Sequence, residues 1–172
     1  AAGSVIEPLD EDGLRTAAAD LVAQDVQSIA ICFINSYRNP AHERRADAVL
    51  REYFPDLAIT ASVSVLAEMR EYERTSTAVV NAYVLPILQS YLQRLRDGLL
   101  AIGITAPLLV SDSNGGLAAA RTAMEKPVFF ISSGRSAGAG GGGNGRGGVR
   151  YGGHHGVCVV GSGRPDFPRQ RI

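Results

Sequence analysis

The stretch Ser28-Ile29-Ala30-Ile31-Cys32-Phe33-Ile34 decides the fold, because six of its seven side chains are apolar and polar residues lie on both sides of it. A strand in a helix-covered parallel sheet has such a continuous apolar run, since both of its faces are buried. One helical pattern precedes this stretch and another follows it. The sequence therefore predicts an α/β fold built on buried strands.

Both flanking helices have recognisable ends. Asp10 is the predicted N-cap of the first helix, and two acidic residues follow it, where they favour the helix dipole. Asn39-Pro40 predicts the N-cap and first residue of the second helix. Pro55 ends that helix.

The rest of the chain continues this alternation. The predicted elements are a strand at 57–62, a long helix at 72–102, a strand at 107–110, a helix at 117–125 and a strand at 128–131. Pro86 predicts that the long helix is kinked or split, and Gly103 predicts its C-terminal end. The element order predicts a largely parallel sheet.

Composition excludes several classes of protein. The 172 residues suffice for about one domain and carry a formal net charge of zero, so no global field indicates nucleic acid or an anionic membrane. No apolar run reaches the roughly 18 to 20 residues that span a bilayer, and the first residues do not resemble a signal peptide. The two cysteines form no disulfide framework, so we expect a cytoplasmic protein.

The densest polar cluster is Glu68-Met69-Arg70-Glu71-Tyr72-Glu73-Arg74-Thr75-Ser76-Thr77, where a loop enters the long helix. Arg70 and Arg74 share a helix face, as do Glu73 and Thr77. Arginine could bind a carboxylate or phosphate here, and glutamate could hold a water or a metal. A solvated first turn with local ion pairs would have the same composition, so both interpretations stay open.

Two glycine-containing turns follow predicted strands. Ser113-Asn114-Gly115-Gly116 precedes a predicted helix, and adjacent glycines there would let a phosphate approach a helix N-terminus. Ser132-Ser133-Gly134 has the same character. An ordinary turn is the alternative for both. Elsewhere, His42 is interpreted as a cap or surface residue and Cys32 as inert core.

Four segments occur in one order along residues 5–134. They are 30–43, Glu71–Thr77 with Asn81–Val84, Ser113–Gly116, and Pro127 with Ser132-Ser133-Gly134. Together they resemble the hydantoinase A / 5-oxoprolinase / acetone carboxylase β-subunit family. Each segment alone is weakly specific, but the ordered set is highly specific.

The resemblance implies a fragment of an actin/hexokinase-like (ribonuclease H-like) ATPase fold that opens a cyclic amide, either a hydantoin or 5-oxoproline. It implies ATP and a divalent metal such as Mg as cofactors, and a second subunit of the hydantoinase B type as partner. The implied catalytic residues are Glu71, Glu73, Arg74 and Thr75. The implied nucleotide-binding residues are Ser113, Asn114, Gly115, Gly116 and Gly134.

Two phosphate-binding motifs of the family, an N-terminal Gly-Gly-Thr turn and a later Phe-Asp-Met-Gly-Gly-Thr-Thr, do not occur in these residues. We therefore expect residues 1–134 to be a partial hydantoinase/oxoprolinase domain that is inactive alone. Residues 135–172 are rich in Gly and Arg and are predicted to be disordered or out of frame. In support of a frameshift, codons for the later motif read from their third base can encode Arg-Tyr-Gly-Gly-His-His, as at 150–155.

Other interpretations remain for the tail and for the whole chain. The tail contains one RGG unit, Arg146-Gly147-Gly148, and three potential metal ligands in His154, His155 and Cys158. The chain could instead be a non-catalytic α/β interaction module with a flexible Gly/Arg tail. A third interpretation is a piece of an acetone carboxylase subunit.

Overall fold

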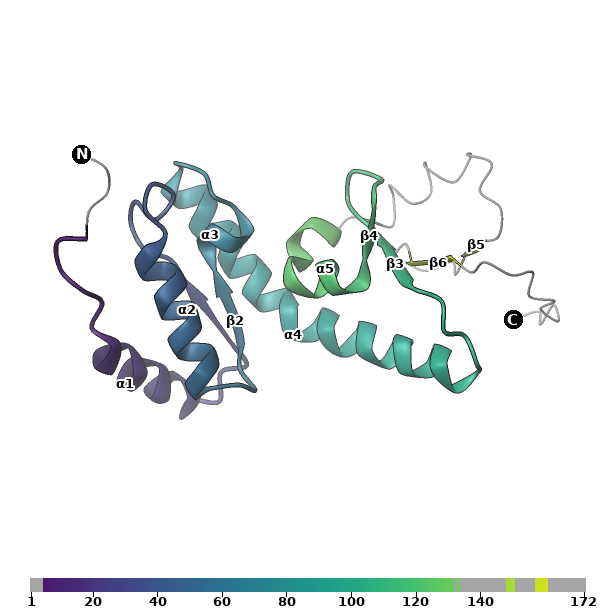
Figure 1. The fold of residues 1–172 in the computed structure, drawn as a ribbon, viewed down its shortest axis with the longest axis horizontal. Helices are drawn as coiled ribbons and strands as arrows, with labels where there is room; N and C mark the ends of the chain where they lie inside the picture. Colours follow the sequence, from purple (N-terminus) through teal and green to yellow (C-terminus); the bar gives the residue numbers. More distant parts are fainter. Residues whose placement is uncertain (1–4, 132, 134–147, 151–156, 161–172) are drawn as a thin grey trace. The chain divides into compact units, whose positions relative to one another are not determined.

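The computed structural model (Figure 1) describes residues 5–131 and 133, and also the backbone of two strands at 148–150 and 157–160. The chain divides into two compact units, Ala1–Gln89 and Ser90–Ile172. Each unit has a sheet of its own, with two strands in the first and four in the second. The α/β class predicted from the sequence is confirmed.

Two parallel strands lie at the centre of the first unit. Its elements are α1 (Glu11–Val22), β1 (Ser28–Ile31), α2 (Ala41–Tyr53), β2 (Ala58–Ala61), α3 (Ser62–Val65) and the start of α4 (Glu71–Ala101). Ser28 pairs with Ala58 and Ile31 with Ala61. The parallel pairing predicted from the apolar run is therefore confirmed here, although β1 ends at Ile31 and leaves Cys32 in the following loop.

The core of this unit forms where α1 and α2 meet the strands. Its buried members are Ala18 from α1, Ile31 from β1, Ala46 and Leu50 from α2, and Ile59 from β2. α2 contacts both strands and also α1. The apolar stripe of α2 is thus the element that joins the helices and the sheet into one core.

The helix caps largely follow the sequence prediction. The side chain of Asp10 accepts a hydrogen bond from the backbone N–H of Gly13 at 2.9 Å, so Asp10 is the N-cap of α1. α2 begins one residue later than predicted, at Ala41, with Pro40 in the cap position. The side chain of Asn39 still accepts from the backbone N–H of Ala41, at 3.0 Å, so it caps the helix from one residue further out.

The long helix α4 is a single element that continues through Pro86, so of the predicted kink or split, the split does not occur. Proline removes one backbone hydrogen bond, but burial of Leu85 and Leu92 on either side favours continuation of the helix. The helix ends at Ala101, and Gly103, with a φ of +80°, is the C′ residue as predicted. The amide of Gly103 donates to the carbonyl of Leu100, and that of Ile104 to the carbonyl of Leu99, which together form a Schellman motif.

The exposed face of α4 is unusually apolar. Between Thr77 and Gln93 the helix has no charged side chain. Three apolar side chains of this stretch are exposed, those of Val79, Tyr83 and Ile87. The helix therefore has more apolar residues here than the first unit buries.

The second unit departs from the predicted parallel sheet. Its elements after α4 are β3 (Leu108–Ser111), β4 (Leu117–Ala119), α5 (Ala120–Glu125), the 3₁₀ helix η1 (Pro127–Phe130), β5 (Gly148–Arg150) and β6 (Val157–Val160). The strand order is β4-β3-β6-β5, and every pairing is antiparallel. A short turn joins β3 to β4, and only antiparallel neighbours can be joined so closely.

One predicted helix of this unit begins later than expected, and one predicted strand was of the wrong type. Residues 117–119 form a strand before α5 begins, and the predicted strand at 128–131 is replaced by η1. Pro127 has a fixed φ that suits the first turn of a helix, and short apolar runs do not distinguish strands from helical turns. β5 and β6 lie inside the stretch predicted to be disordered, and the remainder of that stretch lies outside the described residues.

No helix within the described ranges combines the length and apolar character needed to cross a membrane.

Candidate functional site

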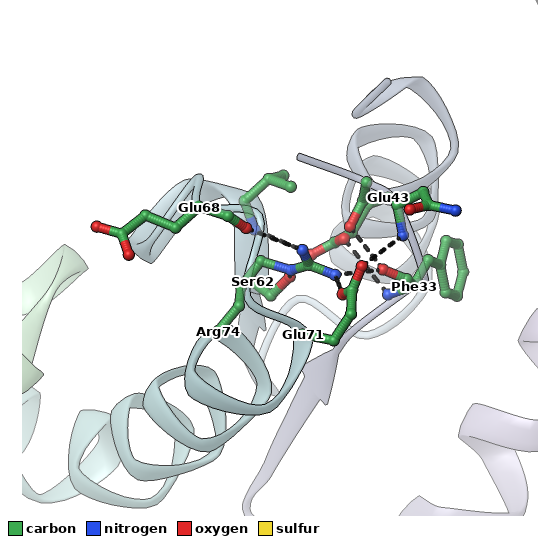
Figure 2. Close-up of polar contacts among 9 residues, drawn as sticks. Phe33, Glu43, Ser62, Glu68, Glu71 and Arg74 are labelled. Carbon is green, nitrogen blue, oxygen red and sulfur yellow. Dashed lines mark hydrogen bonds and ion pairs between the residues drawn. The ribbon is translucent and has the colours of Figure 1, made fainter. Parts of the chain in front are cut away.

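The polar residues of the first unit meet beyond the carboxyl ends of β1 and β2. The loop after β1 contains Phe33 and Asn35, and α3 begins with Ser62 directly after β2. The first turn of α4 brings Glu71 and Arg74 to the same place (Figure 2). Carboxyl ends of parallel strands are where α/β proteins place ligands, so this is the candidate site.

Arg74 is the centre of the site and is only 1% exposed. Its Nε donates to Ser62 Oγ at 3.0 Å, and its Nη1 donates to the carbonyl of Glu68 at 3.1 Å. Its Nη2 donates to the carbonyl of Phe33 at 2.7 Å and also to the carboxylate of Glu71. Every guanidinium nitrogen therefore has a protein acceptor, and Arg74 ties three separate segments together.

Glu71 connects Arg74 to the loop after β1. One carboxylate oxygen accepts from Arg74, and the other accepts from the backbone N–H of Asn35 at 2.9 Å. Asn35 has a φ of +59°, in the left-handed region that is uncommon for residues other than glycine. The carboxylate of Glu71 thus holds this turn in a conformation that most residues adopt at some cost.

Glu43 is a member of the site that the sequence analysis did not single out. It lies in the first turn of α2 and its exposed fraction is 0%. Its two carboxylate oxygens accept from the backbone N–H groups of Val63, at 3.0 Å, and Phe33, at 3.4 Å. The only sequence signal was a glutamate beside His42 in a helix start, a position in which acids are common on the surface.

The predicted catalytic residues have different environments. Arg74 is buried and Glu71 is part of the same network, as described above. Glu73 is exposed, and its carboxylate pairs with exposed Arg70 at 3.4 Å. Thr75 is exposed too, but its hydroxyl interacts with the Cys32 thiol. Of the two predicted glutamates, Glu73 has the more exposed side chain, at 49% against 40% for Glu71.

The thiol of Cys32 lies beside this network and is half-buried. Burial raises its pKa above the ordinary value, whereas hydrogen bonding with Thr75 lowers it. The negative charge of Glu43 raises this pKa further, and the positive charge of Arg74 lowers it. Cys32 is therefore a thiol that stays protonated at neutral pH and is a weak nucleophile.

Alkylation should report this pKa directly. In a Cys158→Ser background, we expect Cys32 to react with iodoacetamide at a midpoint pH above that of free cysteine. Thr75→Val should move the midpoint still higher, because the hydrogen bond that lowers the pKa is lost. Thr77→Val is the matched control, since the Thr77 hydroxyl donates to the carbonyl of Glu73. A midpoint at or below that of free cysteine would contradict the prediction.

The predicted nucleotide turn is a hairpin between β3 and β4, so the expectation of a following helix N-terminus is wrong. Asp112 Oδ1 accepts from the backbone N–H groups of Asn114 and Gly116, both at 2.8 Å. Gly115 has a φ of +89°, which suits glycine at a tight turn. The amides expected to bind a phosphate are therefore already bonded to a carboxylate of the chain itself.

The other residues considered in the sequence analysis are Ser113, Gly134 and His42. The amide of Ser113 donates to the carbonyl of Phe129 at 2.8 Å, and Gly134 lies outside the described residues. The Nε2 atom of His42 is buried without a hydrogen-bond partner, which fits neither a cap nor an exposed residue. Within residues 5–131 and 133, no group of three His, Cys, Asp or Glu side chains is arranged to hold a metal.

The fold and the site define an α/β protein whose polar residues gather beyond parallel strands, and comparison with known families gives the class. The family Hydantoinase/oxoprolinase matches residues 74–147, and the Hydantoinase/oxoprolinase N-terminal region matches residues 1–54. These matches include most of the chain. The chain belongs to the hydantoinase/oxoprolinase family.

Individual relatives agree with this assignment. The chain is 41% identical to caprolactamase subunit alpha of Pseudomonas jessenii over 77% of its own length and 19% of the relative. It is 37% identical to the uncharacterized protein MJ0964 of Methanocaldococcus jannaschii over 80% of its length and 20% of that protein. The chain therefore spans about a fifth of the length of the curated relatives it matches.

Solved structures give the same result. The ATP-dependent caprolactamase of Pseudomonas jessenii has a TM-score of 0.72 and 39% identity, covering 80% of this chain and 20% of that one. Nucleotide-free acetone carboxylase has a TM-score of 0.64 and 26% identity, with the same coverage. The likeness includes segments of both units, because it extends over four fifths of this chain.

Proposed function

We propose that this chain is part of an ATP-dependent enzyme that opens a cyclic amide. The observation that carries the proposal is the likeness to caprolactamase, in sequence and in structure. The carboxylase relatives are less similar to the chain, at 35% and 31% identity against 41% for caprolactamase, so hydrolysis of a lactam is favoured over carboxylation. In the intact enzyme the described residues would form part of an actin-like ATPase fold.

The proposed chemistry addresses the low reactivity of a ring amide. ATP would supply a phosphoryl group for the ring carbonyl oxygen, which converts it into a leaving group. The described residues would contribute by positioning and by charge. Glu73 is the best candidate for contact with the substrate or with a metal-bound water, because its side chain is somewhat more exposed than that of Glu71 and its partner, Arg70, is itself exposed. Glu71 and Arg74 would fix the loop beside it.

The fit of the cofactors to the described residues is partial. A phosphate could take the amides of Asn114 and Gly116 only in place of the Asp112 carboxylate. We assign no ligands to Mg among these residues, since they contain no cluster of three ligating side chains. Residues 1–134 as a partial catalytic domain, and inactivity of the chain alone, remain part of the proposal.

A second subunit is also proposed. Caprolactamase, acetophenone carboxylase and acetone carboxylase relatives are all named as subunits of larger assemblies. By analogy, the enzyme containing this chain would work with a partner of the hydantoinase B type.

A segment exchange tests the proposed function. Residues 5–131 would replace the matching segment of caprolactamase subunit alpha, and lactam-dependent ATP hydrolysis would be measured with its partner subunit present. We expect the chimera to retain activity, and Glu73→Gln to reduce kcat by about 10²-fold or more if this residue assists proton transfer. Glu52→Gln, an exposed glutamate of α2, is the control. A folded chimera without any activity would refute the proposal.

A further inference from the structure

Two buried side chains of opposite charge bind the same two short segments, at Phe33 and at Ser62-Val63. Glu43, from α2, accepts from the N–H groups of Phe33 and Val63. Arg74, from α4, donates to the carbonyl of Phe33 and to the hydroxyl of Ser62, the neighbour of Val63 (Figure 2). The chain beyond each strand is thus held by an acid and by a base.

The two amides that Glu43 binds are related by the register of the sheet. Ser28 pairs with Ala58 and Ile31 with Ala61, and this ladder ends there. Phe33 and Val63 each lie two residues further along, so they keep the same offset. The carboxylate of Glu43 therefore joins corresponding positions beyond the last rung of the ladder, where the strands no longer bond to each other.

Burial makes this arrangement dependent on charge. A carboxylate removed from water is costly unless hydrogen bonds and an opposite charge compensate it. Glu43 has two backbone donors, and the guanidinium of Arg74 shares the residue Phe33 with it. Glutamine could not satisfy both donors in this geometry, because each donor bonds to a different oxygen of Glu43 and one of them would face the NH₂ group of the amide.

From this geometry we infer that Glu43 is a positioning residue for the candidate site. It sets the separation of the two strand ends and, through Phe33, the place of the loop whose Asn35 amide binds Glu71. It acts through Arg74 and Glu71 and contacts no substrate. The inference deepens the proposed function and rests on it for the meaning of the site, but its structural content can be tested without any activity.

Amide hydrogen exchange of the whole chain, resolved by residue, is the test. In Glu43→Gln we expect exchange at Phe33 or Val63 to accelerate by about tenfold or more, since one donor loses its acceptor. Exchange at Asn35 should also accelerate, although Glu43 does not touch it. The amides of the β1–β2 ladder should change by less than about twofold.

Glu52→Gln on the same helix is the matched control and should leave all of these rates unchanged. If Glu43→Gln does not fold, Glu43→Asp keeps the charge but shortens the reach, and the same selective pattern is expected in it. A uniform acceleration throughout the first unit, or an unchanged rate at Asn35, would overturn the inference.

The effect of Glu43→Gln on catalysis distinguishes the positioning role of Glu43 from the proposed function of the chain. In the caprolactamase chimera, Glu43→Gln should lower kcat while the KM for ATP stays the same, because the variant disturbs loop geometry in the first unit. If the chimera with native Glu43 is inactive, the proposed function fails and the exchange result still stands. If the chimera is active and Glu43→Gln leaves kcat unchanged, the positioning role is refuted.

Discussion

Arg74→Met should reduce the free energy of unfolding of the first unit by about 3–5 kcal/mol, because removing one partner of a buried charged network leaves the others uncompensated. Methionine keeps much of the volume and the flexible stem of arginine. It leaves the carbonyl of Phe33, the carbonyl of Glu68 and the carboxylate of Glu71 without the donor that now joins them. The expected loss of stability therefore comes more from polar groups left without a hydrogen-bond partner than from lost packing.

Denaturant unfolding followed by far-ultraviolet circular dichroism would measure this effect. Arg70→Met is the matched control, since Arg70 lies one helical turn earlier and its side chain is 74% exposed. The control should change stability by less than about 0.5 kcal/mol. A loss below about 1 kcal/mol for Arg74→Met would mean that water replaces the guanidinium easily, and that the site is more open than its burial indicates.

Leu50→Ala should destabilise the same unit by about 2–5 kcal/mol, through lost burial and the cavity left behind. Leu50 is 1% exposed and lies in the core with Ala18, Ile31 and Ile59. α2 is the helix that touches both strands and α1, so a cavity at Leu50 weakens each of these contacts.

The control for this substitution is Leu21→Ala in α1, where the leucine is 40% exposed. Its cost should be well under that of Leu50→Ala, since little apolar surface is lost from the core. Because Arg74 is not a member of the core that contains Leu50, the double variant also informs on coupling. Additive losses would indicate that core and polar site contribute independently to stability.

The sequence was sufficient for features that depend on local chemistry. Asp10 caps α1 because its side chain can reach the amide of Gly13, and Gly103 ends α4 because its φ is positive. The apolar run at 28–34 correctly predicted a strand in a parallel pair. The run did not indicate where the strand ends, because it continues to Ile34 whereas β1 ends at Ile31.

Features that depend on distant contacts could not be predicted in this way. Glu43 looked like an ordinary acid at a helix start, and only the pairing of β1 with β2 brings Phe33 and Val63 to it. Asp112 was not predicted as a site residue, because the glycines after it indicated free amides, whereas its carboxylate binds the amides of Asn114 and Gly116. The family resemblance implied a catalytic role for Arg74, but nothing in the sequence indicated that its side chain is buried.

The bridge from Glu43 to Phe33 and Val63 also bears on how such chains can vary in length. Both amides lie two residues past the ladder, so inserting or deleting a single residue in either short interval would rotate one amide away from the carboxylate. Related chains that keep this bridge should therefore show no length change between the end of either strand and its bridged residue. Insertions are better tolerated in the 23–27 turn before β1, which lies outside the bridge and is largely exposed.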